Sequence, residues 1–242
     1  MVYETILTTN YYTSYFGSKR KPRHLISVSM PRRSYGQLCP IASALDLVGE
    51  RWTLLVVREL LLGPKRFSDL QVGLPGIGSN ILSDRLKELE AASVVSRRRL
   101  PPPAASWVYE LTDRGRELGD IVLRLGRWSV SSPAFRQSDG TARPEWTILS
   151  LYARYDLSAA MAGPASVELR FGDETYSARI DEGQLTIGRG AATSPDVIVS
   201  LDHDTLNRIF RSKGRERNRV ANGVTIVEGS RDAFESFLRL FT

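Results

Sequence analysis

The hydrophobic pattern of the chain opens with a long amphipathic stretch. Between residues 41 and 62, apolar side chains recur at three- and four-residue steps, at Leu45, Val48, Trp52, Leu55, Val56 and Leu60. This spacing predicts one amphipathic helix across the whole stretch. Gly63 and Pro64 follow directly and predict its end.

The next segment predicts two more helices separated by a tight turn. Ser68 can cap the free amides of a short helix that runs to about residue 72, and residues 73–78 then provide the turn. A stronger helix begins at Gly78 or Ser79. Its leucines occupy positions i, i+4 and i+7 and so line one stripe, at Leu82, Leu86 and Leu89.

Two strand patterns and a further helix complete the first half. Residues 94–99 and 107–111 predict the strands of a hairpin, with residues 101–106 as its loop. Thr112 then begins a helix whose apolar residues keep helical spacing up to Trp128. A short helix, a turn, a second helix and a two-stranded ribbon follow the element order of a winged helix-turn-helix, whose second helix enters the major groove of DNA.

The second half predicts an α+β fold. Residues 131–144 are rich in Ser, Pro, Gly and charge, which favours a linker. Beyond it, the patterns predict helices at residues 145–162, 204–212 and 231–241, and strands at residues 167–171, 175–180, 184–187, 197–201 and 223–228.

The expected fold class of the whole chain is therefore α+β, in two domains. A winged helix-turn-helix domain is expected at residues 35–130, a linker at 131–144 and a separate α+β domain at 145–242. Residues 1–34 are expected to form a disordered extension, because they are polar, rich in Tyr and Thr, and lack the apolar core of a signal peptide. Met30 is an alternative start for the compact part.

The candidate DNA contacts lie on the second helix of this motif, opposite its leucine stripe. Steps of about 100° per residue place Asn80, Asp84 and Lys87 on that side, with Ser83 at its edge. The amide of Asn80 has the donor and acceptor pair that suits adenine. Asp84 can accept from cytosine or form an ion pair with Arg85 or Lys87, so its role stays open.

Neighbouring cations complete the candidate set. Three arginines follow one another in the first hairpin strand, and Lys65 and Arg66 precede the short helix, so we interpret these five cations as phosphate contacts. The candidate DNA-binding residues are Lys65, Arg66, Ser68, Ser79, Asn80, Ser83, Asp84, Lys87, Arg97, Arg98 and Arg99. A polar helix face alone is more often a solvated surface, and only the ordered set of elements favours DNA.

Composition and charge agree with this interpretation. The chain has 42% hydrophobic and 25% charged residues, and no apolar stretch approaches the roughly 20 residues of a membrane span. Its net charge of +6 belongs to the first half, since residues 1–135 hold 19 Lys and Arg against 12 Asp and Glu, while residues 136–242 hold 14 against 15. Cys39 is the only cysteine, which excludes an intrachain disulfide and favours the cytoplasm.

Several segments of the first half resemble the HxlR family of bacterial regulators. They are Cys39-Pro40-Ile41, residues 46–62 (DLVGERWTLLVVRELLL), residues 66–70 (RFSDL) and residues 81–89 (ILSDRLKEL), and the resemblance covers about residues 35–128. It implies a homodimer that reads a pseudo-palindromic site in double-stranded DNA, with repression as the commoner outcome. Some relatives sense oxidants through a cysteine at the position of Cys39. In this chain Cys39 is either such a sensor or a small, buried apolar residue.

The second half resembles the sterol carrier protein 2-like fold. The similarity rests on residues 195–201 (PDVIVSL), 204–206 (DTL), 222–229 (NGVTIVEG) and 237–241 (FLRLF). It implies an apolar tunnel and hence a hydrophobic small-molecule effector, the other interpretation being a scaffold without ligand.

No cofactor, metal or catalytic function is expected. The two histidines and Cys39 have no candidate catalytic partners, and the adjacent Asp202, His203 and Asp204 rarely converge on one ion. The sequence therefore predicts a DNA-binding transcriptional regulator that is not an enzyme. The alternative is a lipid-binding or small-molecule-binding protein whose first half is only an interaction module.

Overall fold

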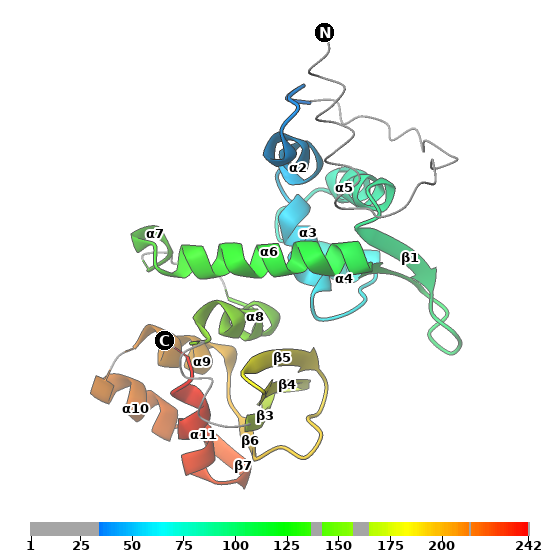
Figure 1. Ribbon diagram of the computed structural model, residues 1–242. Helices are drawn as coiled ribbons and strands as arrows, with labels where there is room; N and C mark the ends of the chain where they lie inside the picture. The colour runs from blue at the N-terminus through cyan, green and yellow to red at the C-terminus, as the bar shows by residue number, and fades with distance from the viewer. Residues whose placement is uncertain (1–33, 137–141, 157–164, 213, 242) are drawn as a thin grey trace.

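The computed structural model describes residues 34–136, 142–156, 165–212 and 214–241. The expected disordered extension therefore lies almost wholly outside the described residues. The chain forms an N-terminal half of helices with one hairpin and a C-terminal half in which helices pack on a sheet (Figure 1).

The N-terminal half is a winged helix-turn-helix, as predicted. In chain order its elements are α2 (Pro40–Val48), α3 (Thr53–Leu60), α4 (Phe67–Gly73), α5 (Ser79–Ala91), β1 (Val95–Arg99), β2 (Trp107–Leu111), α6 (Asp113–Val130) and α7 (Pro133–Arg136). The predicted leucine stripe of α5 is buried at Leu82, Leu86 and Leu89. It packs in one core with residues of α3 and α4, including Val56, Leu60 and Leu70.

The predicted single helix over residues 41–62 is wrong, because the chain breaks it into α2 and α3. Gly49 caps the first piece, and Trp52 adopts a left-handed backbone conformation with φ of 82° before α3 begins. The break redirects the chain so that α3 buries Val56, Val57 and Leu60, whereas Ile41 on α2 stays exposed. The apolar spacing continues across the break, so periodicity alone could not reveal it.

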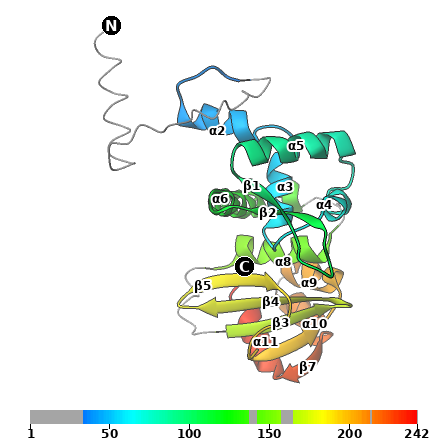
Figure 2. The same cartoon turned by 90° about the vertical axis from the view of Figure 1, so that its right-hand side faces the viewer.

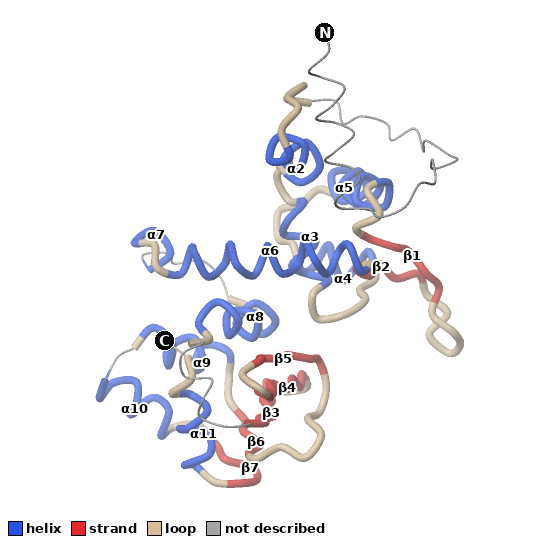
Figure 3. Tube along the Cα trace, in the orientation of Figure 1, coloured by secondary structure: helices blue, strands red, loops and turns tan. Residues whose placement is uncertain are grey.

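The predicted hairpin is confirmed, and a third segment extends it. Strands β1 and β2 pair antiparallel from Val95 opposite Leu111 to Arg99 opposite Trp107, and a loop joins them (Figure 3). On the other edge of β2, the Lys65 N–H donates to the Tyr109 carbonyl at 3.0 Å, and the Tyr109 N–H donates to the Lys65 carbonyl at 2.8 Å. The wing is therefore hydrogen-bonded to the segment between α3 and α4.

Helix caps explain two of the boundaries. Thr112 begins α6 as predicted, since its hydroxyl accepts from the Gly115 N–H at 3.0 Å. A Cβ at Gly115 would overlap the Val94 carbonyl, so only glycine allows this approach of α6 to the wing. The predicted cap at Ser68 is wrong: Ser68 lies within α4, and the Asp69 carboxylate accepts from the Arg66 N–H at 3.0 Å.

The C-terminal half is α+β, as predicted. Its elements are α8 (Pro144–Arg154), β3 (Ala165–Phe171), β4 (Glu174–Asp181), β5 (Gln184–Arg189), β6 (Val197–Ser200), α9 (His203–Arg211), α10 (Gly214–Asn222), β7 (Thr225–Gly229) and α11 (Arg231–Leu238). The five strands form one sheet in the order β5-β4-β3-β6-β7, in which β3 and β6 are parallel. Helices α9, α10 and α11 lie on one face of it (Figure 2).

Three features from the expected linker onward differ from the prediction. Helix α8 ends at Arg154 rather than at residue 162, and residues 157–164 lie outside the described part. The expected linker at 131–144 contains the short helix α7. Helix α10 was not predicted, because its sequence GRERNRVAN offers only Val220 and Ala221 to the core and so lacks a hydrophobic stripe.

A buried charged cluster joins the two halves. The Glu59 carboxylate of α3, 4% exposed as a residue, accepts from Arg58 at 2.7 Å, from the Lys65 ammonium at 2.7 Å and from the indole N–H of Trp146 on α8 at 2.8 Å. Lys65 also lies 3.7 Å from Glu145, which in turn pairs with Arg189 of β5 at 3.0 Å.

Helix α6 makes the second connection, because it lies beside α8 (Figure 1). The guanidinium of Arg127 donates to the carbonyls of Tyr152 and Tyr155, at 3.1 and 2.7 Å. A polar group that loses its partner on burial is costly, so these bonds fix α6 against the end of α8.

We predict that Glu59→Ala destabilises the folded protein by about 3 kcal/mol, because it leaves Lys65 and Arg58 close together without their shared counter-charge. Trp146→Phe should cost less, about 1 kcal/mol for the lost hydrogen bond. Urea unfolding of the three proteins, followed by circular dichroism, measures both changes. Equal losses in the two variants would show that the Glu59 charge does not anchor the junction.

Candidate nucleic-acid interface

Helix α5 presents a polar face to solvent opposite its buried leucines. Asn80, Asp84 and Lys87 are exposed on that face and Ser83 is half-buried beside them, so the structure brings these four predicted residues together. Ser79 is exposed at the first position of the helix. No side chain caps the helix at Gly78, so nothing in the cap covers its first amide groups.

The ion pair considered for Asp84 is not formed. Arg85 points instead to Glu88, at 2.8 Å, and to Glu50, at 4.0 Å. Within the described part of the chain, neither Asp84 nor Lys87 has a salt-bridge partner. Lys87 can therefore offer its whole charge to a ligand.

The three wing arginines differ in how free their charges are. The Arg97 guanidinium stacks over Trp107, 4.5 Å from the ring centre. Arg98 lies on the other side of the strand, where its Nε donates to Glu110 at 2.8 Å. The Nε of Arg99 donates to the Ala105 carbonyl at 3.2 Å. Among the residues that the structure describes, no carboxylate pairs with Arg97 or Arg99, whereas Glu110 offsets the charge of Arg98.

The structure separates Lys65 from the other candidates. Its side chain is only 11% exposed, and its ammonium points at Glu59 and Glu145 in the junction between the halves. Arg66 and Ser68 are exposed at the start of α4, where the Ser68 hydroxyl donates to Asp69 at 3.3 Å. No local pattern could show that Lys65 turns inward, because one of its partners lies in the other half of the chain.

Large apolar side chains are also exposed on the N-terminal half, on α2, on α3, on α6 and two residues before α2, and together we call them the α2–α6 apolar surface. They are Leu38, Ile41, Leu45, Leu55, Ile121, Leu125 and Trp128. Cys39 is half-buried at the start of α2, where its carbonyl accepts from the Ser43 N–H at 2.9 Å.

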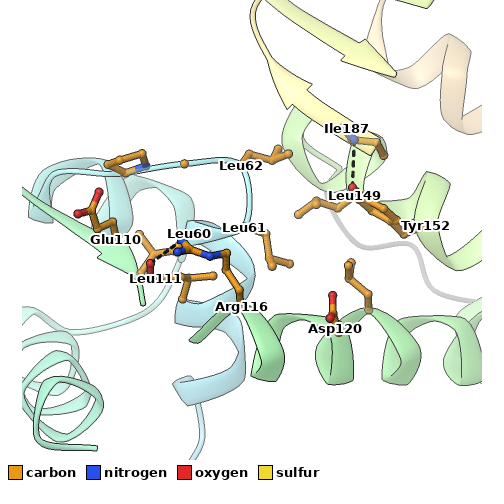
Figure 4. A pocket seen from close by; sticks show the side chains of 13 residues that line it. Leu60, Leu61, Leu62, Glu110, Leu111, Arg116, Asp120, Leu149, Tyr152 and Ile187 are labelled. Carbon is orange, nitrogen blue, oxygen red and sulfur yellow. Dashed lines mark hydrogen bonds between the residues drawn. The ribbon is translucent and has the colours of Figure 1, made fainter. Parts of the chain in front are cut away.

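A cavity of about 320 Å³ lies between the two halves, and no sequence feature predicted it. Its walls come from the end of α3 and the following loop, from β2, from α6 and from α8 and β5 (Figure 4). Because these walls come from four separate stretches of the chain, no sequence motif marks it. The predicted apolar tunnel would lie elsewhere, within the C-terminal half.

Two negative findings concern the described residues. Among them, no helix is long and apolar enough to cross a membrane. The same residues contain no group of three or more His, Cys, Asp or Glu side chains placed to hold a metal ion.

Two family models match the chain in consecutive segments. The model described as HxlR-like helix-turn-helix matches residues 47–134, which span α3 to the beginning of α7. The model described as alkyl sulfatase C-terminal matches residues 153–242, most of the α+β half. The sterol carrier protein 2-like type thus stays a prediction.

Curated relatives named as helix-turn-helix regulators align with about two fifths of the chain. The uncharacterized HTH-type transcriptional regulator YvaP of Bacillus subtilis is 37% identical over 102 residues, which are 41% of this chain and 94% of YvaP. The HTH-type transcriptional regulator YodB of the same organism is 37% identical over 93 residues, 38% of this chain and 83% of YodB. The solved structure of reduced YodB aligns with 38% of this chain and 92% of its own, at 36% identity and a TM-score of 0.35.

Three findings agree with one another. The N-terminal half is a winged helix-turn-helix, the HxlR-like model matches it, and it is 37% identical to YvaP over 94% of the length of YvaP. The relatives are transcriptional regulators rather than enzymes. The chain belongs to the HxlR-like helix-turn-helix family and is a DNA-binding transcriptional regulator.

Proposed function

We propose that the protein is a cytoplasmic repressor that binds a pseudo-palindromic DNA site as a homodimer, with one α5 of each copy in the major groove. The observation that carries this proposal is the polar, solvent-facing side of α5, which stands opposite a fully buried leucine stripe and beside an arginine-bearing wing. A helix anchored on one face and polar on the other can enter a groove without unfolding its core.

Asn80 is the residue we assign to base reading. It lies one position into α5, and the N-terminal end of a recognition helix is where base edges are met. Its amide can bond adenine through a donor and an acceptor at once. Ser79 and Ser83 flank it and can bond to a base or a phosphate, and the unpaired Asp84 can accept from cytosine.

The remaining exposed cations are assigned to the phosphate backbone. Lys87 lies on the groove-facing side of α5, and Arg97 and Arg99 extend from the wing with uncompensated charge. Arg66 and Ser68, with Arg98, can add contacts at the rim. Lys65 is left out of the set, because its ammonium is held between Glu59 and Glu145.

The α2–α6 apolar surface is the surface we assign to the dimer. It exposes Trp128 at 75% and Ile121 at 62% on α6, and large apolar side chains left exposed in this number are typical of protein interfaces. A two-fold dimer would place two copies of α5 about one helical turn of DNA apart, roughly 34 Å.

We further propose that the C-terminal half is a regulatory module of sterol carrier protein 2-like type for a hydrophobic small molecule. The α+β architecture of that half, with helices on one face of a five-stranded sheet, supports the comparison with this fold. If the protein is instead a lipid carrier, its N-terminal half would bind no particular DNA sequence.

The first prediction concerns Asn80. Selection of binding sites from random DNA with the purified chain should return a pseudo-palindrome, and Asn80→Ala should weaken binding to it about tenfold to a hundredfold, or ~1–3 kcal/mol. Fluorescence anisotropy with the selected site and with a scrambled one measures the change. The affinity of Asn80→Ala for the scrambled site should equal that of the wild type, because the substitution removes no phosphate contact.

Arg97→Ala is the matched control for this experiment. It should weaken binding to both DNAs alike and reduce the slope of log affinity against log salt by about 1, since it removes one phosphate contact. A chain that selects no sequence, or that binds all DNAs equally weakly with and without Asn80, would contradict the repressor and favour the lipid carrier.

The second prediction concerns the dimer. Leu125→Glu and Trp128→Glu should convert the protein to a monomer in sedimentation velocity and weaken its binding to the full palindrome by at least about tenfold, because a single head gains from only one half-site. Val227→Glu, at an exposed position of β7 in the C-terminal half, should leave the dimer unchanged. A dimer that persists in both charged variants would place the interface elsewhere.

The third prediction concerns oxidation, the second input that we consider. Cys39 is half-buried next to the fully exposed Leu38, and as the only cysteine it can form a disulfide only with another chain. Diamide should therefore produce a cross-linked dimer in a non-reducing gel and lower DNA affinity, and Cys39→Ser should abolish both effects. If DNA release under diamide is the same in wild type and Cys39→Ser, oxidation has no part in regulation.

A further inference from the structure

The cavity between the halves has the size and lining of a small-molecule site. At about 320 Å³ it is near the lower end of ligand pockets, which run from roughly 300 to 1,000 Å³. Its largest surfaces are aliphatic and come from both halves of the chain: Leu61, Leu62, Leu123, Leu149 and Ile187. A compact ring system can fill this space and remove those side chains from water.

The ionised side chains that line the cavity differ in whether a neighbouring opposite charge neutralises them. Glu110 accepts from Arg98 at 2.8 Å. Arg116 lies 2.6 Å from Asp113, and its other nitrogen donates to the Leu111 carbonyl at 3.0 Å.

Asp120 is the remaining ionised residue of the lining, and within the described part of the chain it has no salt-bridge partner. Its side chain rises from α6 into the space that faces Leu149 (Figure 4). Asp120 is solvent-exposed, so the cavity offers one carboxylate that is hydrated and has no partner cation among the described residues.

Tyr152 adds a directed polar group on the opposite wall. Its hydroxyl accepts from the Ile187 N–H at 3.0 Å and so is fixed in position (Figure 4). Burial raises the pKa of Tyr152, and the nearby charge of Asp120 raises it further, against a lowering by the hydrogen bond from Ile187. The hydroxyl thus stays protonated and can still donate to a bound molecule.

We propose that this cavity binds a small apolar molecule that carries a protonated amine, with the amine on Asp120 and the apolar body between the leucines of the two halves. The inference rests on the proposed function, since it assigns an effector site to a regulator, but it places that site between the halves rather than inside the C-terminal half. An anionic ligand would add a second negative charge beside Asp120, which disfavours it.

The position of the cavity links its occupant to the wing. Its wall includes the loop from Leu62 to Pro64, which leads directly to Lys65, and the end of β2 at Glu110 and Leu111. Lys65 pairs through its backbone with Tyr109 of β2 and through its ammonium with Glu59 and Glu145. A molecule that alters the spacing of the two halves therefore acts on the strand that supports the wing arginines.

The test uses three probes with one ring system and different charges: naphthylmethylamine, naphthalenemethanol and naphthoate. In isothermal titration calorimetry with the full chain, the amine should bind at least about tenfold more tightly than the alcohol and the carboxylate. Asp120→Asn should remove this preference, whereas Glu117→Gln, on the same helix but outside the cavity, should keep it. Equal binding of the three probes, or a preference that survives in Asp120→Asn, overturns the proposal.

A filled cavity should exclude the amine. Leu123→Trp places an indole ring in the cavity from α6, and Leu62→Trp places one there from the opposite wall. The variant that keeps the circular dichroism spectrum and the unfolding midpoint of the wild type is used for the test. A folded variant with unchanged amine affinity overturns the site.

DNA affinity is measured separately, with and without saturating amine, on the selected site. A shift of at least about threefold that disappears in Asp120→Asn supports regulation through the cavity. Calorimetry needs no DNA, so an absent amine preference disproves the site even if the protein represses. Failure to select any DNA sequence would disprove the repressor while leaving the site standing.

Discussion

One buried carboxylate, that of Glu59, holds together α3, the segment that follows it and α8, whose Trp146 lies 87 residues further along the chain. It receives the ammonium of Lys65, the guanidinium of Arg58 and the indole N–H of Trp146, and a Cβ at Gly73 would overlap its Oε2. A buried charge costs several kcal/mol unless its partners are close and well oriented. Helices α3, α4 and α8 must therefore keep one relative arrangement, and the wing, bonded to the backbone of Lys65, is fixed with them.

The parts of the fold that the sequence predicted are those set by local rules. The leucine stripe of α5, the hairpin, the start of a helix at Thr112 and most strands of the second half each depend on residues within a few positions of one another. Hydrophobic spacing and capping chemistry act over that range, so the pattern and the element agree. The groove-facing side of α5 followed in the same way, because burying Leu82, Leu86 and Leu89 leaves Asn80, Asp84 and Lys87 no other side of the helix to occupy.

What the sequence did not predict depends on contacts between distant segments. The apolar spacing runs unbroken through Trp52, and only the packing of Val56 and Val57 requires the turn there. Lys65 has the sequence context of a phosphate contact, yet its partners are a glutamate inside an apolar helix and another in the second half. The cavity has no motif at all, since its walls meet only after both halves have folded and docked.

The same geometry constrains how any signal from the second half could reach DNA. Strand β2 has the pocket-lining Glu110 and Leu111 at its end, Tyr109 bonded to Lys65, and Trp107 beneath the Arg97 guanidinium. Helix α5, in contrast, is held by its leucines within the core of the N-terminal half. A displacement of the second half therefore moves the wing before it moves α5. Phosphates carry no sequence information, so on our proposal that the wing arginines contact them, such a displacement would change how tightly the protein holds DNA and leave its choice of sequence intact.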